Sequence, residues 1–297
     1  MDKVIFGYDD DVLDPCMDPV TKAIFTKDTP ESRAALNGLL SDILGQEVGV
    51  FAVGVNEPPV DDIRDRQIRY DINCRFSTGE LANVEMTMYP DASEVNRLEY
   101  YAAKLHASQN LKGKDKSYKD VKKTYQISFV VKERLLPDEV LVHWFEYYDK
   151  KNKISLGGCS NVISIELCKL DSILKKPLDE MTGTELWAMF FRFSSHMEHR
   201  PLINEIVQRK ESIAMAAKTL ITISKDEIER ARLLSEYKYL MDLQSKMVDA
   251  RRAGRAEGKE EGKLEMIKSL HSMGLSDEQI AQAANMPLDK VRMHLKT

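Results

Sequence analysis

The sequence lacks any long apolar run, and it has few cysteines and little net charge. No stretch approaches the roughly 18 apolar residues that a membrane-spanning helix requires, so the sequence predicts no membrane span. The four cysteines show no C-x-x-C spacing, which argues against a zinc site or a disulfide framework. A net charge of −5 excludes a protein that coats DNA through a strongly basic surface. Any contact with nucleic acid must therefore be local.

The chain also lacks the features of an exported protein. Its start, MDKVIFGYDDD, is acidic and has neither the basic region nor the apolar stretch of a signal peptide. We therefore expect a cytoplasmic protein with reduced thiols. With 297 residues and 43% hydrophobic side chains, the chain is long and apolar enough for one large globular domain and a smaller one.

Residues 66–89 contain two runs of alternating apolar and polar residues, joined by Ser77-Thr78-Gly79. This alternation predicts a β-hairpin. A two-residue loop would mix polar and apolar side chains on both faces, whereas a three-residue loop with Gly79 in the left-handed conformation gives one wholly apolar face. In that register the pairs are Cys74 with Ala82, Ile72 with Val84, Tyr70 with Met86, Asn73 with Asn83, Asp71 with Glu85, and Arg69 with Thr87.

Asp71 and Glu85 are thus predicted to face each other on neighbouring strands, with side-chain roots about 5 Å apart. Two carboxylates this close repel each other unless a cation lies between them or one is protonated. Mg2+ prefers such oxygen ligands and completes its shell with water and phosphate oxygens. The pair therefore indicates either a metal site for phosphodiester hydrolysis or simply an exposed polar strand face.

Further motifs accompany the acidic pair. Residues 18–25, DPVTKAIF, resemble an opening D-x-x-F-K-x-x-F, in which we expect Asp18 to cap a short helix. Residues 97–101, RLEYY, resemble an R-x-x-Y-Y helix, and a Gly/Glu/Lys-rich tail runs into a small helical segment. Together these stretches resemble the PD-(D/E)xK nuclease superfamily, and within it the Rpn family of recombination-promoting nucleases and transposases. The resemblance covers nearly the whole chain.

The resemblance implies a metal-dependent DNA endonuclease in which Asp71 and Glu85 bind Mg2+ or Mn2+. The sequence departs from the superfamily at Thr87, where Lys, or in this family Gln, is usual. Threonine has no charge with which to position the attacking water or to stabilise the transition state. We therefore expect Arg69, the neighbour of Thr87, or Lys104 on the following helix to supply the charge, which makes these five residues the predicted catalytic set.

The predicted elements follow the order of a restriction-endonuclease-like core. Helices are expected near residues 18–25, 30–44 and 93–109, and strands over 48–55, the hairpin and 124–131. This αβββαβ order predicts an α/β fold, a mixed sheet flanked by helices, with an α-helical C-terminal extension. Residues 141–148, 153–156 and 162–167 are expected to extend the sheet or to form a small β appendage.

A lysine-rich segment is the predicted DNA contact. Lysines neutralise phosphates without reading the base sequence. The candidate residues are Lys112, Lys114, Lys116 and Lys119, together with Arg97 on the preceding helix. A solvated loop explains the lysines equally well.

We divide the chain into a nuclease-like domain (1–225), a long charged helix or stalk (226–264) and a small C-terminal segment (265–297) that resembles a helix-turn-helix. Gly254, Gly258 and Gly262 recur on one face of the stalk, so either an oligomerisation stalk or a flexible hinge is reasonable. The C-terminal helices can thus form a homo-oligomer, and the last segment can bind either DNA or protein.

Three functions remain open from the sequence. The first is the Mg2+-dependent DNA endonuclease. The second is a nuclease-fold protein that has lost turnover and binds DNA or assembles with proteins, which Thr87 and the acidic net charge favour. The third is a transcriptional regulator that acts through its C-terminal segment.

Overall fold

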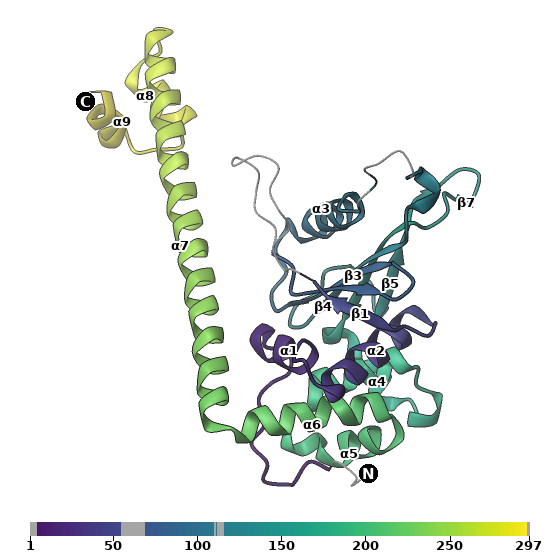
Figure 1. Cartoon of the computed structure of the whole chain (residues 1–297). Coiled ribbons are helices and arrows are strands. Elements are labelled where there is room, and N and C mark those ends of the chain that lie inside the picture. Colours follow the sequence, from purple (N-terminus) through teal and green to yellow (C-terminus); the bar gives the residue numbers. More distant parts are fainter. Residues whose placement is uncertain (1–4, 55–68, 110, 112–115, 296–297) are drawn as a thin grey trace. The chain divides into compact units, whose positions relative to one another are not determined.

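The computed structural model describes residues 5–54, 69–109, 111 and 116–295, and the chain divides into two compact units (Figure 1). The first unit extends through Ser235, and the second begins at Glu236. The helices are α1 (Asp18–Phe25), α2 (Pro30–Leu44), α3 (Glu94–Ala107), α4 (Gly183–Phe193), α5 (Arg200–Arg209), α6 (Glu211–Lys225), α7 (Glu227–Ser272), α8 (Asp277–Ala283) and α9 (Leu288–Leu295). Short 3-10 helices are η1 (Tyr118–Asp120), η2 (Leu167–Lys175), η3 (Leu178–Glu180) and η4 (Met197–His199).

A mixed sheet forms the centre of the first unit, with strand order β1-β2-β3-β4-β8-β5. Its strands are β1 (Val50–Val53), β2 (Ile72–Phe76), β3 (Leu81–Thr87), β4 (Thr124–Val130), β5 (Val142–Phe145) and β8 (Ser160–Glu166). Strand β4 runs parallel to β3 and β8, and the other pairs are antiparallel. Strands β6 (Tyr148–Asp149) and β7 (Ile154–Ser155) form a separate two-stranded sheet. Residues 141–167 therefore both extend the main sheet and form an appendage.

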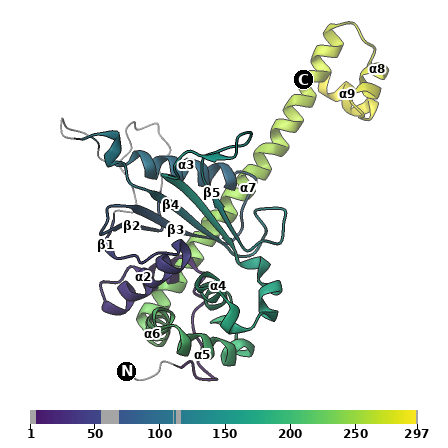
Figure 2. The same cartoon turned by 90° about the vertical axis from the view of Figure 1, so that its right-hand side faces the viewer.

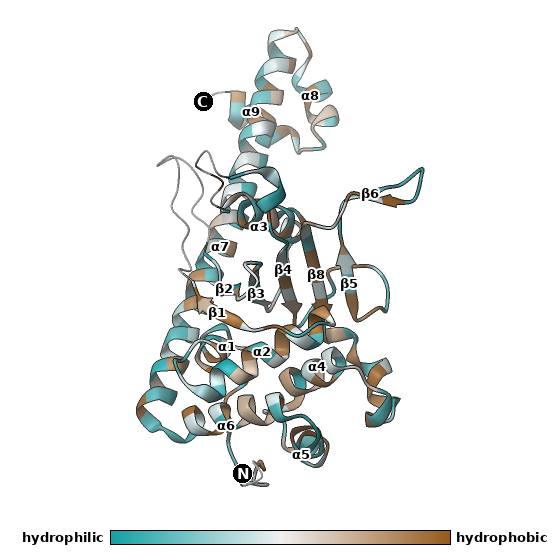
Figure 3. Ribbon diagram, turned by 45° about the vertical axis from the view of Figure 1, so that its right-hand side comes forward, coloured by the Kyte–Doolittle hydropathy of each residue, from teal (hydrophilic) through white to brown (hydrophobic). Residues whose placement is uncertain are grey.

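The two faces of the sheet are covered differently. Helix α3 links β3 to the parallel strand β4 and lies over one face, while α1, α2, α4 and α6 lie on the other side (Figures 1 and 2). On that other side, the sheet contributes Ile72, Val84, Ile127 and Ile163 to the main apolar core. Hydrophobic residues are concentrated in these strands and in the helices packed on them (Figure 3). The aromatic residues of α4 complete this core.

The hairpin register expected from the sequence is confirmed from Ile72 to Arg75, but Tyr70, expected opposite Met86 on the apolar face, instead packs with Leu81 and with Leu105 of α3. Ile72 pairs with Val84, and Cys74 pairs with Ala82. The loop is Ser77-Thr78-Gly79, because the Phe76 N–H donates to the Glu80 carbonyl. Gly79 has φ of 95°, a left-handed conformation that a residue with a Cβ rarely adopts.

The second unit contains the C-terminal part of α7 together with α8 and α9. Ser276 caps α8, and its hydroxyl accepts from the N–H of Gln279. The small core consists of Ile267, Ile280 and Val291, one from each helix. The two expected C-terminal helices are therefore present, and they pack against the end of α7.

These features confirm the α/β, restriction-endonuclease-like fold class: αβββαβ order, a mixed sheet flanked by helices, and a helical C-terminal stretch. None of the helices in the described part of the chain combines the length and the apolar character needed to span a bilayer.

Candidate active site

Glu85 lies in the middle of β3, on the face that α3 covers, and its side chain is only 3% exposed. Its Oε1 accepts a hydrogen bond of 2.9 Å from the side-chain amide of Asn83. Its Oε2 lies 3.5 Å from the guanidinium group of Arg97 and has no hydrogen-bond partner among the described residues. One oxygen of this carboxyl group is therefore buried without a donor.

Asp71 immediately precedes β2. The pairing of β2 with β3 ends at Ile72 and Val84, so Asp71 lies just beyond it, close enough for its charge to raise the pKa of Glu85. One carboxylate oxygen of Asp71 accepts from the backbone N–H of Met86 at 3.2 Å, and the other lies 3.1 Å from Nζ of Lys22. The side chain retains 18% exposure, so this end of the acidic pair is reached more readily by solvent than Glu85 is.

Helix α1 contributes a residue pair, Asp18 and Lys22, that was not predicted to belong to the site. Lys22 lies 2.9 Å from Asp18 and also contacts Asp71, so it joins two carboxylates. The expectation that Asp18 caps α1 is wrong, because Met17 is the N-cap residue and no side chain caps this helix. The spacing of Asp18 and Lys22, one helical turn apart, was the available signal that both point in the same direction.

Helix α3 contributes a second charged pair on the other side of Glu85. Arg97 binds Glu94 with a closest contact of 2.6 Å and donates to the hydroxyl of Thr87 at 3.1 Å. The Thr87 hydroxyl in turn donates to Glu94 at 3.2 Å. The guanidinium group also lies over the ring of Tyr101, 5.4 Å from its centroid. Arg97, which was predicted to contact DNA, therefore lies beside the acidic pair.

Burial raises the pKa of both central carboxyl groups. The pKa of Glu85 rises to about 8 because of burial and the charge of Asp71, against the opposing effects of Arg97 and Asn83. The pKa of Asp71 rises to about 6 because of burial and the charge of Asp18, although Lys22 opposes the shift. Both groups therefore favour the protonated form more strongly than ordinary carboxyl groups do.

The other predicted site residues are placed as follows. Arg69 is exposed, and Nζ of Lys104 lies over the ring of Tyr100, 5.8 Å from its centroid. Lys116 and Lys119 are exposed near η1, whereas Lys112 and Lys114 lie outside the described residues. The roles assigned to these residues stay predictions.

The donor set around Asp71 and Glu85 fits a hard cation that keeps part of its water shell. Among the described residues, no group of three or more His, Cys, Asp or Glu side chains is arranged to hold a metal ion. Mg2+ is commonly bound by only one or two carboxylates, with water and phosphate oxygens as its other ligands. The unpartnered Oε2 of Glu85 is an oxygen that such an ion would use.

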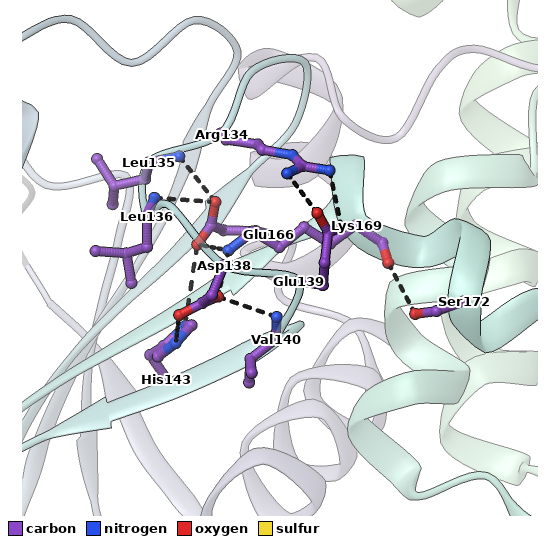
Figure 4. Close-up of polar contacts among 10 residues, drawn as sticks. All are labelled: Arg134, Leu135, Leu136, Asp138, Glu139, Val140, His143, Glu166, Lys169 and Ser172. Carbon is purple, nitrogen blue, oxygen red and sulfur yellow. Dashed lines mark hydrogen bonds and ion pairs between the residues drawn. The ribbon is translucent and has the colours of Figure 1, made fainter.

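A second polar cluster lies at the end of β8 and stabilises a loop (Figure 4). The buried carboxylate of Glu166 accepts from the backbone N–H groups of Leu135 and Leu136 and lies 2.7 Å from Nζ of Lys169. Lys169 also binds Asp138, which is 3.0 Å from His143. These contacts attach the β4–β5 loop to β8.

Comparison with known proteins gives one family. The family model described as PD-(D/E)XK nuclease family transposase matches residues 15–250, which include the acidic pair, α1 and α3. No match was found among the curated proteins or among the solved structures.

Proposed function

We propose that this chain, which belongs to the PD-(D/E)XK nuclease family transposases, is a metal-dependent DNA endonuclease of the recombination-promoting type. Asp71 and Glu85 would hold Mg2+ or Mn2+, and DNA would be the substrate. The proposal also places the protein in the cytoplasm, as its sequence indicates.

The observation behind this proposal is the excess of negative charge at the site. Four carboxyl groups, those of Asp18, Asp71, Glu85 and Glu94, are connected through contacts or mutual electrostatic effects. Two cations, Lys22 and Arg97, lie among them. When all six groups are ionised, the negative charges exceed the positive charges by two, which is the charge of one divalent cation. The raised pKa values of Asp71 and Glu85, which arise from burial and from the neighbouring carboxylates, support this proposal because a divalent cation would offset the same negative charge.

Each residue then has a distinct role. Asp71 and Glu85 would hold the Mg2+ ion, which would supply polarisation of the scissile phosphate and a lowered pKa for an attacking water. Lys22 and Arg97 hold Asp71 and Glu85 in place and add positive charge beside them, as a substitute for the charge that Thr87 lacks. Arg69 and Lys104 are the alternatives predicted from the sequence. Exposed Lys116 and Lys119 would contact the DNA backbone away from the scissile phosphate.

Cleavage of supercoiled plasmid in the presence of Mg2+ or Mn2+ tests this function. We expect Asp71→Ala to lower the nicking rate by roughly a hundredfold or more, since it removes a metal ligand that acts on the transition state. Asp171→Ala, at an exposed position on η2, is the matched control and should nick like the wild type. Equal nicking by the wild type and Asp71→Ala would refute the assignment.

The second candidate function is a nuclease-fold protein that binds or assembles without turnover. The hydroxyl of Thr87 contacts Glu94 and Arg97 and brings no charge to the site, which favours this alternative. Titration calorimetry with Mn2+ separates the two functions. Heat of binding that is lost in Glu85→Gln supports the nuclease, whereas no heat in either protein supports the assembly function.

We also propose that the chain self-associates through α7. The helix spans Glu227–Ser272, and Tyr239 and Leu243, one turn apart and so on the same side of it, are exposed. Helices in proteins gain most of their stability from packing of an apolar face. The core of the second unit uses only the C-terminal end of α7, and a second copy of the chain would cover the exposed residues.

A further inference from the structure

Buried polar atoms without partners are concentrated on the face of the sheet that α3 covers. Most of the unpartnered side-chain atoms in the described part of the chain come from this one region. They are the Tyr70 hydroxyl, Asn83 Oδ1, Glu85 Oε2, Gln126 Nε2, the hydroxyls of Ser128 and Ser164, and His143 Nδ1. Ser128 and Ser164 are fully buried. Such a concentration needs a physical explanation, because buried polar groups in native proteins are almost always paired.

Four of these side chains form a single row across the sheet. Strand register pairs Glu85 with Ser128 and Ser128 with Ser164, and Ser164 pairs with His143 on β5. Residues that pair directly across neighbouring strands point to the same face, and the strands lie about 4.8 Å apart. The row therefore presents a polar side chain at regular intervals of that size.

This spacing suits a water molecule between each pair of neighbours. Two hydrogen bonds of about 2.8 Å, meeting at one water oxygen, span about 5 Å. Each water then has at least two polar partners, as a stable buried water requires. His143 Nδ1 lies 4.0 Å from Oε1 of Glu166. This separation is too long for a direct hydrogen bond, but a water molecule can bridge it.

We propose that a row of buried water molecules crosses the sheet beneath α3, held by Ser128 and Ser164, and connects Glu85 to His143. The row gives Glu85 Oε2 the hydrogen-bond donor that it lacks. At the other end it reaches the cluster of Asp138 and Glu166, where Asp138 is 46% exposed and contacts solvent. The row requires neither DNA nor a metal ion, so its test is independent of the nuclease assignment.

Substitution of the two serines distinguishes a hydrated row from a dry one, because the two cases predict different changes in the melting temperature. If water bridges the hydroxyls, Ser128→Ala and Ser164→Ala each remove a partner from the waters, and the melting temperature should fall by about 2–4 °C. If the row is dry, each change removes an unpaired buried hydroxyl, and the melting temperature should stay the same or rise.

Ser32→Ala is the matched control. Ser32 is also fully buried and its hydroxyl also lacks a partner, but it lies on α2, away from the row. Alanine is a favourable helix residue, so this change should leave the melting temperature unchanged or raise it. A fall in Ser128→Ala and Ser164→Ala together with no fall in Ser32→Ala supports the row. A rise in all three variants overturns it.

Two further measurements test the proposal, and the second does not depend on the folding of any variant. The double variant Ser128→Ala/Ser164→Ala should lower the melting temperature by less than the sum of the single changes, because the two hydroxyls share a water. In a crystal structure of the unchanged full chain, water density should lie between the two serine hydroxyls. Full additivity, or direct packing of the serines with no density between them, overturns the proposal.

Discussion

Burial in the folded protein favours the protonated form of Glu85, whereas the proposed metal binding would need its ionised form. Its side chain is 3% exposed, and burial without a counter-charge disfavours the ionised form. In the proposed function, a metal ion would bind the carboxylate and displace its proton. The nearest cation, Arg97, lies 3.5 Å away and also serves Glu94. A divalent cation beside Glu85 would therefore stabilise its ionised carboxylate.

This conflict predicts a pH-dependent stability in the absence of divalent cations. The pKa of Glu85 is about 8 in the folded protein, against an ordinary value of about 4.3 in the unfolded chain. Between these values the folded state binds more protons, so stability is greatest near the lower pH and is lost as the pH rises through the folded pKa. The melting temperature should therefore fall from about pH 5 to about pH 8.

Thermal denaturation of the wild type and Glu85→Gln checks this prediction. The glutamine variant has no proton to lose at this position, so its melting temperature should change less with pH. Addition of Mg2+ at the higher pH should raise the melting temperature of the wild type and leave that of Glu85→Gln nearly unchanged. Identical pH profiles in the two proteins would show that Glu85 does not titrate in this range.

At the scale of elements, α3 is the helix that completes the site. It follows β3 directly and crosses the sheet to β4, so its first turn lies beside the end of the strand that carries Glu85 and Thr87. Glu94 in that turn is 5% exposed, and its charge is balanced by Arg97 one turn later. The helix thus brings its own ion pair to the sheet.

We expect Arg97→Ala to lower the free energy of unfolding by roughly 2–3 kcal/mol, because it leaves the buried carboxylate of Glu94 without its cation. The double variant Arg97→Ala/Glu94→Gln should recover part of this loss. Glu99→Ala, on the exposed side of the same helix, should change the stability by about 0.5 kcal/mol or less. Urea denaturation measures all four proteins. A double variant less stable than Arg97→Ala would contradict this account of the pair.

At the scale of the whole molecule, the two units use their apolar residues in different ways. The first unit encloses a large core between the sheet and the helices on one face. The second has a small core of three buried residues at the end of α7. Much of α7 beyond Ser235 is exposed, including apolar side chains. The second unit therefore leaves more of its apolar side chains exposed than it buries in its small core.

Self-association through α7 predicts that a charge on its apolar residues separates the copies. Leu243→Asp should lower the molar mass measured by analytical ultracentrifugation, because it would bury a carboxylate in the interface. Ser245→Asp adds the same charge at a nearby exposed polar position and should leave the mass unchanged. A wild-type chain that is already monomeric at all concentrations would contradict the proposal.

The sequence by itself determined the hairpin, its register from Ile72 to Arg75 and the αβββαβ order. These features follow from short-range patterns: a period of two in the strands, a glycine that accepts the left-handed conformation, and apolar residues at helical spacing. The tertiary structure alone decided that Lys22 and Asp18 join the acidic pair and that Arg97 is shared by Glu85 and Glu94. Such contacts depend on how helices pack on a sheet, and the degree of burial that shifts the pKa values arises only from that packing.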